Sequence, residues 1–466
     1  MRESMETRQN DESRLYTEAY IKRARAAQAI FEDATQADAD RAARAVAKVV
    51  YDNAEALAVL AAEDTRMGNV PDKTAKNKSK ARLIWNSLKG KKSRGILERD
   101  AESGITTIAK PLGTVAAITP CTNPIVTPMS NSMFALKCAN AIIITPHHNA
   151  TLCSARAVEL FRAELRKLGF PEDLVQILDR HSRENTRNLI SMADAVIATG
   201  GAGMVYAAYS SGKPALGVGA GNVQAIIDRG ADYGAAVRRI TEGRAFDNGI
   251  ICSGEQSAIC PEEDFDAILR AFADCGCYTI KNPAEREALR AALFEDGKMS
   301  RHAVGQSAAA VARLAGIEID ARTKAIAVEA EGTGLGDVLA KEKMCPVIAL
   351  YRYRDFAEAV AIAKENLEAE GKGHSVAIHS DNREHIEYAG KALPVSRFLI
   401  NQVCASSAGG SFQNGLAPTN TMGCGSWGNN SLSENLSYRH LMNVSRIAYH
   451  MPDNPVPSDE ELWAEI

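Results

Sequence analysis

A cysteine between two glycines lies in the segment with the clearest chemical potential, Phe246-Asp-Asn-Gly-Ile-Ile-Cys-Ser-Gly-Glu-Gln256. Gly249 and Gly254 flank Cys252, and the segment joins a helical pattern to a strand pattern. A nucleophilic cysteine needs a tight, exposed turn and a nearby backbone N–H that can hold an oxyanion. The spacing makes Cys252 a candidate nucleophile, and it equally fits a cysteine buried in the core.

Two further segments follow predicted strands. Thr119-Pro-Cys-Thr-Asn-Pro124 comes after the first parallel strand, at the edge where ligands bind in open α/β sheets. Asn123 in it is either a site residue or part of a simple turn and N-cap. Ala198-Thr-Gly-Gly-Ala-Gly203 precedes a helix, where glycines let the backbone approach a phosphate. As a bare pattern this match to GxGxxG is weak, and the run Gly217-Val-Gly-Ala-Gly221 is similarly ambiguous.

A glutamate and a histidine complete the candidates. Glu342 precedes a strand in Glu342-Lys-Met-Cys-Pro-Val347, a position where a single glutamate is usually solvated. His374 lies between a glycine-rich turn and a strand in Gly371-Lys-Gly-His-Ser-Val376. An imidazole there can serve as an acid or base, although a lone histidine is more often structural.

Strand and helix patterns alternate along the chain, which predicts an α/β fold with two parallel-sheet domains. Residues 15–63 have helical periodicity, the basic stretch 73–92 suggests a surface helix, and 405–430 has the composition of a loop. The predicted strands form two series: 114–119, 141–145, 175–178, 193–198 and 223–227, and then 257–260, 325–328, 347–350, 375–379 and 397–401.

The composition excludes several classes of protein. The chain has 466 residues with 45% hydrophobic content, enough for two or three domains. A net charge of −4 argues against a nucleic-acid partner. No apolar run reaches the ~18 residues of a membrane span, and the polar start does not resemble a signal peptide. The ten cysteines lack a paired zinc pattern, so we expect no metal and a reducing cytoplasm.

These segments resemble, in the same order, motifs of the aldehyde dehydrogenase superfamily. FDNGIICSGEQS is similar to the cysteine motif of its coenzyme-A-acylating branch. ITPCTNP, ATGGAGMVYAAYSSGKPALGVGAGN and LAPTNTMGCGSWGNNSLSEN resemble bacterial acetaldehyde and propionaldehyde dehydrogenases of that branch. They also resemble the aldehyde half of bifunctional aldehyde-alcohol dehydrogenases. The resemblance covers residues 15 to 450.

The resemblance implies roles for individual residues. Cys252 matches the nucleophile, Asn123 the oxyanion-hole residue, and His374 a histidine near the reacting centre. Glu342 matches a contact to the nicotinamide ribose. The implied cofactor-binding residues are Thr119, Pro120, His147, Thr199, Gly200, Gly201, Gly219 and Glu342.

One departure separates this sequence from the hydrolytic branch. Where hydrolytic members have a glutamate that activates water, the matching residue here is Val218, and no Asp or Glu occurs from Gly200 to Ile227. Hydrolysis of a thioester needs such a base. The thiol of coenzyme A, with a pKa of ~8.5 by analogy with cysteine, attacks the thioester as a thiolate and needs less help from a base. The resemblance therefore implies NAD, with NADP not excluded, and coenzyme A as co-substrate.

The family fold also implies the domain organisation. We expect a dinucleotide-binding domain over 15–232 with an oligomerisation hairpin near 98–112, a catalytic domain over 233–425, and a C-terminal oligomerisation segment over 426–466. The oligomerisation element would combine this hairpin with the stretch near 436–449. The resemblance also implies a homodimer or tetramer.

The predicted substrate is a short aliphatic aldehyde, propionaldehyde before acetaldehyde, because small residues surround Cys252. Without an alcohol dehydrogenase half, the chain would depend on a separate alcohol dehydrogenase to recycle the cofactor. A cytoplasmic location, including the lumen of a bacterial microcompartment with its shell as partner, is expected. Two alternatives stay open: a hydrolysing aldehyde dehydrogenase that gives the free acid, and a catalytically idle scaffold protein.

Overall fold

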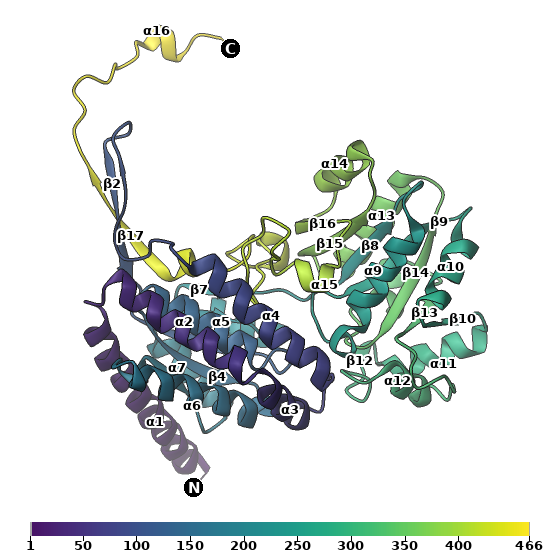
Figure 1. The fold of residues 1–466 in the computed structure, drawn as a ribbon, viewed down its shortest axis with the longest axis horizontal. Coiled ribbons are helices and arrows are strands. Elements are labelled where there is room, and N and C mark those ends of the chain that lie inside the picture. Colours follow the sequence, from purple (N-terminus) through teal and green to yellow (C-terminus); the bar gives the residue numbers. More distant parts are fainter. Residues whose placement is uncertain (1, 466) are drawn as a thin grey trace.

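Two lobes, each built around a parallel sheet, make up the body of the molecule (Figure 1). The computed structural model describes residues 2–465. The predicted α/β class with two parallel-sheet domains is confirmed. Within the described range, no helix is both long and apolar enough to cross a bilayer.

The first lobe contains a five-stranded parallel sheet in the order β5-β4-β3-β6-β7. Two of its strands, β3 and β4, are buried along their whole length, as expected for a parallel sheet with both faces covered. The chain order reverses between β3 and β6, which are adjacent although β4 and β5 come between them in sequence. The strands are β3 (Thr114–Thr119), β4 (Ala141–Pro146), β5 (Val175–Ile177), β6 (Ala195–Ala198) and β7 (Ala215–Gly217).

Helices from the first half of the chain cover this sheet. The helix α5 is buried at every residue, because α2 and α4 pack over its outer side. The predicted helical region 15–63 is divided among three helices. The helices are α1 (Arg2–Phe31), α2 (Gln36–Asp52), α3 (Ala54–Thr65), α4 (Val70–Leu88), α5 (Val126–Lys137), α6 (Thr151–Lys167), α7 (Arg183–Met192) and α8 (Ala202–Tyr209).

The second lobe contains a seven-stranded parallel sheet in the order β10-β13-β14-β9-β8-β15-β16. The prediction that 223–227 belongs to the first series is wrong, because this strand pairs with β9 and β15. Its apolar residues suit either sheet, so periodicity alone does not assign it. The strands are β8 (Val223–Ile227), β9 (Glu255–Pro261), β10 (Cys277–Ile280), β13 (Ala325–Glu329), β14 (Val347–Tyr353), β15 (Gly373–His379) and β16 (Val395–Ile400).

Helices cover the second sheet as they do the first, and a short hairpin accompanies them. The helices are α9 (Tyr233–Ala245), α10 (Phe265–Asp274), α11 (Pro283–Leu293), α12 (Ala308–Leu314), α13 (Phe356–Ala369), α14 (Arg383–Ala392) and α15 (Cys404–Ser407), and the hairpin strands are β11 (Phe294–Glu295) and β12 (Lys298–Met299). The predicted loop 405–430 is confirmed apart from short helical turns.

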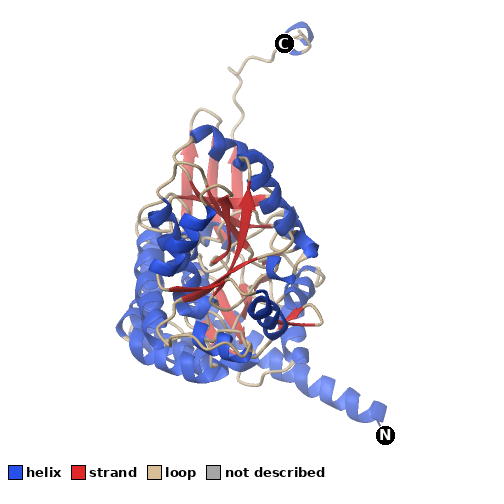
Figure 2. Cartoon of the chain, turned by 90° about the vertical axis from the view of Figure 1, so that its right-hand side faces the viewer, coloured by secondary structure: helices blue, strands red, loops and turns tan. Residues whose placement is uncertain are grey.

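A three-stranded antiparallel sheet extends from the first lobe. It joins β1 (Gly95–Asp100), β2 (Ile105–Pro111) and β17 (Met442–Ala448), so the predicted pairing of the hairpin with the C-terminal stretch is confirmed. Beyond it the chain runs outward to the short helix α16 (Asp459–Leu462), away from the free end of α1 (Figures 1 and 2). The oligomerisation role of this sheet stays a prediction.

The helix α4 differs from the prediction in its surroundings. The basic stretch does form a helix, but Lys73, Lys76 and Asn77 are buried. The helix packs against α3 and α5 and also contacts the loop that precedes β9 in the other lobe. The prediction of a surface helix is therefore wrong for the face that carries these side chains.

Candidate active site

The loop that carries Cys252 has an unusual backbone. It follows α9 through the short helical turn η3 (Phe246–Gly249), in which Asp247 and Asn248 have φ angles of 51° and 53°. Gly249 continues this left-handed conformation at φ 73°, and a Cβ there would approach Cys345 to 2.6 Å. Glycine is thus required at 249, as its place beside the cysteine suggested.

Cys252 and Asn123 line the same cavity between the two lobes. Asn123 arrives from the β3–α5 loop, and Cys252 from the turn before β9, where the Gly254 N–H donates to the Ile251 carbonyl at 2.8 Å. The cavity encloses about 530 Å³, part of it open to solvent. Its walls are formed by Lys76, Ser79, Lys80, Asn123, Phe246, Ile251, Cys252, Ser253, Ala405, Ser406, Gly409, Thr419, Asn420 and Met422.

The surroundings of Cys252 do not favour its thiolate in the free protein. Burial raises the pKa of Cys252 to about 12, and the nearby Glu342 and Cys424 raise it further, whereas Arg397 opposes them. The thiol is consequently protonated near neutral pH until substrate, cofactor or a positive charge changes its environment.

Residues predicted to contact the cofactor gather where the strand order of the first sheet reverses. Thr119 ends β3, Pro120 follows it, and Thr199 to Gly201 follow β6, so both segments meet at the carboxyl ends of adjacent strands. Crevices at such reversal points bind nucleotides in open α/β sheets. His147 lies at the end of β4, the strand on the other side of β3.

The polar groups at these strand ends are compatible with a dinucleotide. The Thr119 hydroxyl is buried without a hydrogen-bond partner among the side chains that the structure describes. Gly201 is exposed, a Cβ there would meet no atom within 4 Å, and it precedes α8 as an N-cap residue without a side-chain cap. The first amides of α8 and the space beside them therefore suit a phosphate. Burial first, and then His148 and His181, lower the pKa of His147 to about 4, so its imidazole is neutral at pH 7.

The loop with Gly219 and Gly221 packs against the cysteine loop. The Gly219 N–H donates to the Cys424 sulfur at 3.3 Å, and a Cβ at Gly221 would collide with the carbonyl oxygen of Cys252. Gly219 thus lies between the Cys252 loop and the end of β6, where the Val218 N–H donates to the Ala198 carbonyl at 3.3 Å, and its contact with the cofactor stays a prediction.

His374 is placed differently from the other candidates. It lies at the start of β15, is 1% exposed, and does not line the cavity of Cys252. Its Nδ1 has no partner in the part of the chain that the structure describes. Burial and then Arg397 lower the pKa of His374 to about 3, so the ring is neutral. A role for His374 at the reacting atoms stays a prediction.

Glu342 lies close enough to Cys252 to influence its ionisation. Burial raises the pKa of Glu342 to about 8, Glu370 adds to the increase, and Arg244 opposes it. The Glu342 backbone N–H donates to the Glu370 carboxylate at 2.8 Å, which holds this turn against the end of α13. Glu342 is thus half-buried and not the fully solvated surface glutamate that the sequence pattern alone suggests.

We expect Glu342→Gln to have two opposite effects. If Glu342 contacts the nicotinamide ribose, its loss should raise the cofactor KM and lower kcat by up to ~10²-fold, because small misplacements of reacting groups are costly. The ionised carboxylate raises the pKa of Cys252, so the variant should react faster with iodoacetamide, chiefly above pH 8 where Glu342 is charged.

Steady-state kinetics and alkylation rates of the free enzyme measure these two effects. Glu368→Gln is the matched control, since the Glu368 carboxylate lies near the surface and pairs with Lys372 at 2.6 Å. If both the cofactor KM and the alkylation rate of the Glu342 variant stayed at wild-type values, Glu342 would have no part in the site.

Sequence reasoning missed two charged residues that line the cavity and one buried glutamate outside it. Lys76 and Lys80 line the cavity of Cys252, and with Lys73 they are spaced so as to share one helix face, a signal that was available in the sequence. Glu255 begins β9 and accepts a 2.6 Å hydrogen bond from the Cys404 N–H. Burial raises the pKa of Glu255 to about 8. Glu255 lies within the quoted cysteine motif, but the sequence analysis gave it no role and its residue type does not predict burial.

Comparison with known proteins identifies the family. The model of the aldehyde dehydrogenase family matches residues 5–416. Succinate-semialdehyde dehydrogenase (acetylating) of Clostridium kluyveri is 51% identical over 95% of this chain and 98% of its own length. Sulfoacetaldehyde dehydrogenase (acylating) of Cupriavidus necator is 40% identical over 96% of this chain and 91% of its own length. The chain therefore belongs to the aldehyde dehydrogenase family.

Solved structures agree with this assignment. An acetylating aldehyde dehydrogenase from Geobacillus thermoglucosidasius superimposes with a TM-score of 0.92 at 34% identity, covering 96% of this chain and 99% of that one. Propionaldehyde dehydrogenase of Rhodopseudomonas palustris, with bound CoA and an acylated cysteine, gives a TM-score of 0.84 at 26% identity over 93% and 97% of the chains. The protein is thus an oxidoreductase of the family's acylating kind, which uses NAD or NADP and coenzyme A.

Proposed function

We propose that this enzyme reversibly converts a short aldehyde with an anionic group at its far end into the corresponding acyl-coenzyme A, through a thioester on Cys252. The observation that carries the proposal is an ammonium group, Lys80, in the cavity that also contains Cys252 and Asn123. NAD rather than NADP stays a prediction from the family resemblance.

The residues of the cavity suit the two half-reactions. Cys252, once deprotonated, forms a bond to the aldehyde carbon, and the Asn123 side chain and the Cys252 N–H hold the resulting oxyanion. When bound, the nicotinamide accepts the hydride, which leaves Cys252 acylated. The same oxyanion donors then serve the attack of the coenzyme A thiol, which releases Cys252. Because one thioester replaces another, the transfer can run in both directions.

The surroundings of Lys80 favour an anionic ligand. Its Nζ donates to the carbonyl oxygens of Gly409 and Thr419, at 3.0 and 3.4 Å. Among the side chains that the structure describes, no carboxylate forms an ion pair with it, and an ammonium has three N–H donors. One donor and a full charge are therefore available to the cavity. A carboxylate or sulfonate on the substrate would supply the missing counter-charge.

The names of the relatives support this substrate class. Succinate semialdehyde and sulfoacetaldehyde, after which the two relatives are named, are short aldehydes that end in a carboxylate or a sulfonate. Propionaldehyde, expected from the small residues near Cys252, lacks such a group and would leave Lys80 unused. It is the second candidate substrate, supported by the structural likeness to a propionaldehyde dehydrogenase.

We expect Lys80→Met to lower kcat/KM for succinate semialdehyde by about 10- to 100-fold, because a hydrogen bond between charged groups contributes roughly 1.5–3 kcal/mol. For propionaldehyde the change should stay within about threefold. Lys78→Met is the matched control, since Lys78 is exposed on the same helix. Equal losses for both aldehydes, or wild-type preference for propionaldehyde, would refute the anionic substrate.

The pH dependence of substrate preference gives a second readout of Lys80. Burial first, and then Lys76, lower the pKa of Lys80 to about 8, with Cys252 acting in the opposite direction. The ammonium, and with it the attraction for an anion, is present below this pKa and lost above it. The ratio of kcat/KM for succinate semialdehyde to that for propionaldehyde should therefore fall as pH rises through 8. In Lys80→Met the ratio should not change with pH.

A further inference from the structure

A buried carboxylate anchors the loop that leads to Cys252. The Asp247 side chain is 0% exposed, and its Oδ2 accepts hydrogen bonds from Lys76 at 2.7 Å and Lys73 at 3.1 Å. Its Oδ1 accepts from the Asn69 N–H at 3.0 Å, and its own N–H donates to Asp72 at 2.8 Å. All four partners lie at the start or in the first turns of α4, in the other lobe.

The loop needs such anchoring because its backbone is strained. Asp247 and Asn248 are non-glycine residues in the left-handed region, a conformation that persists only where surrounding contacts hold it. The Asn248 side chain adds hydrogen bonds to the carbonyls of Gly68 and Gly305, at 3.2 and 2.9 Å. The direction in which the chain approaches Cys252 therefore depends on contacts from the segment at the start of α4.

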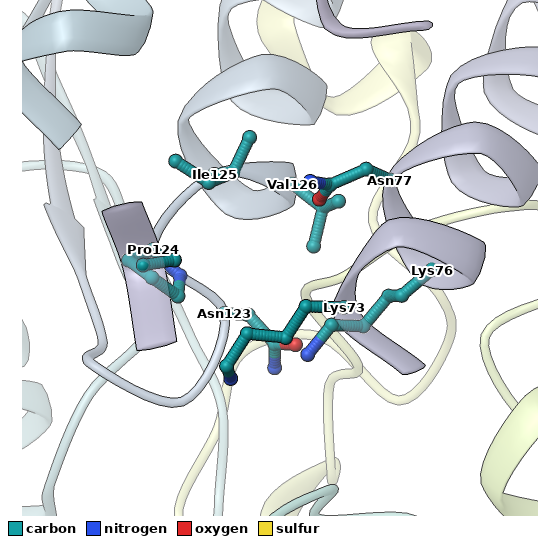
Figure 3. A pocket seen from close by; sticks show the side chains of 8 residues that line it. Lys73, Lys76, Asn77, Asn123, Pro124, Ile125 and Val126 are labelled. Atoms are coloured by element: carbon teal, nitrogen blue, oxygen red, sulfur yellow. The ribbon is translucent and has the colours of Figure 1, made fainter. Parts of the chain in front are cut away.

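Lys76 differs from the other partners of Asp247 because it also reaches the β3–α5 loop that carries Asn123, here called the oxyanion loop. Its Nζ donates to the carbonyl oxygen of Thr122 at 3.3 Å, and Thr122 immediately precedes Asn123. Figure 3 shows the side chains of Lys73 and Lys76 extending from α4 toward Asn123. Lys76 also lines the cavity of Cys252, whereas Lys73 does not.

We propose that Lys76 is a positioning residue that sets the distance between Cys252 and Asn123, by bonding the Asp247 carboxylate on the cysteine loop and the Thr122 carbonyl on the oxyanion loop. This inference rests on the proposed function, because it assumes that Cys252 and Asn123 act on the same carbonyl group. The ammonium connects two loops from different lobes at one point. Its loss would let the oxyanion donor move relative to the thiol without removing either group.

Lys73 provides a matched control within the same cluster. It bonds the same carboxylate from the same helix and is similarly buried, with side chains 3% and 7% exposed for Lys73 and Lys76. No hydrogen bond joins Lys73 to the oxyanion loop in the described chain. In Lys76→Met, Asp247 keeps Lys73 and the Asn69 N–H, so its charge remains paired and the protein should fold.

The decisive measurement is the rate of cofactor reduction in the first turnover, followed by stopped-flow absorbance. Lys76→Met should lower this rate by about 10²-fold, as expected when reacting groups are misplaced by about an ångström. Lys73→Met should change the first-turnover rate by less than about threefold, even if it lowers the melting temperature as much as Lys76→Met does. Cofactor affinity should stay near wild type in both, and Lys76→Arg should recover part of the rate.

A double-mutant cycle separates positioning from general loss of structure. If Lys76 acts through Asn123, Lys76→Met should cost less than about fivefold when added to Asn123→Ala, because the oxyanion donor is already gone. Equal rate losses in the Lys73 and Lys76 variants, or additive losses with Asn123→Ala, would overturn the proposal. Should Lys76→Met not fold, Lys76→Gln replaces it under the same criteria. A wild-type enzyme without a first-turnover phase would instead overturn the proposed function.

Discussion

With aldehyde and NAD but no coenzyme A, the enzyme should reduce at most about one cofactor per active site and then nearly stop. Cys252 would remain acylated, because the second half-reaction lacks its thiol, and such a burst is a sign of covalent catalysis. Adding coenzyme A should restore steady turnover. Stopped-flow absorbance at 340 nm measures the burst, and mass spectrometry of the intact protein and the products identifies the acylated cysteine and the acyl-coenzyme A.

The structure sharpens this expectation. No carboxylate is among the residues that line the cavity of Cys252, although Glu342 is near enough to raise the pKa of its thiol. Glu342 is therefore the carboxylate to test as a base for water. Sustained production of the free acid, at rates near those with coenzyme A, would favour the hydrolysing alternative. The Glu342→Gln variant would then show whether this carboxylate activates the water.

Cys252→Ala should abolish dehydrogenase activity and leave cofactor affinity nearly unchanged. Hydride transfer requires the covalent adduct on sulfur, and among the residues lining the cavity only Cys252 carries a thiol. Initial rates with aldehyde, NAD and coenzyme A measure the loss, and cofactor titration by fluorescence measures binding. A catalytically idle scaffold protein, by contrast, would show no activity in the wild type either.

Cys121→Ala is the control for this substitution. Cys121 precedes Asn123 in the same loop but does not line the cavity, and burial raises the pKa of its thiol. We expect this variant to keep most of the wild-type rate. If Cys252→Ala retained more than about one per cent of wild-type activity and Cys121→Ala lost it, the nucleophile would be Cys121.

Much of the fold follows from patterns in the sequence. Strands such as β3 and β4 are continuous apolar runs bounded by Gly, Pro or Asn, and their predicted bounds differ from the observed ones by a residue or less. Two short strands of the parallel sheets, β7 and β10, were not predicted from the sequence. The assignment of β8 to the second sheet required the pairing itself.

Part of the candidate site was also predictable, because some of its residues lie in short local motifs. Cys252, Asn123 and the turn at Thr199–Gly201 lie in local motifs, so sequence alone could select them. Local sequence could not predict that Cys252 and Asn123 line one cavity, because the cavity is assembled from segments in both lobes. His374 shows the reverse case: its motif was visible, but the fold buries the side chain outside the cavity.

The sequence by itself determined the α/β class, the nucleophile candidate and the acylating branch, because apolar periodicity and short motifs are local properties of the chain. Only the tertiary structure decided which charges act in the site. Lys73, Lys76 and Lys80 have the composition of a solvated helix face, yet Lys73 and Lys76 are buried and Lys80 is half-buried. Burial then turns ordinary surface lysines into partners of Asp247 and, in our proposal, of the substrate's anionic group. Desolvation depends on what packs against a residue, and the packing partners here come from distant parts of the chain.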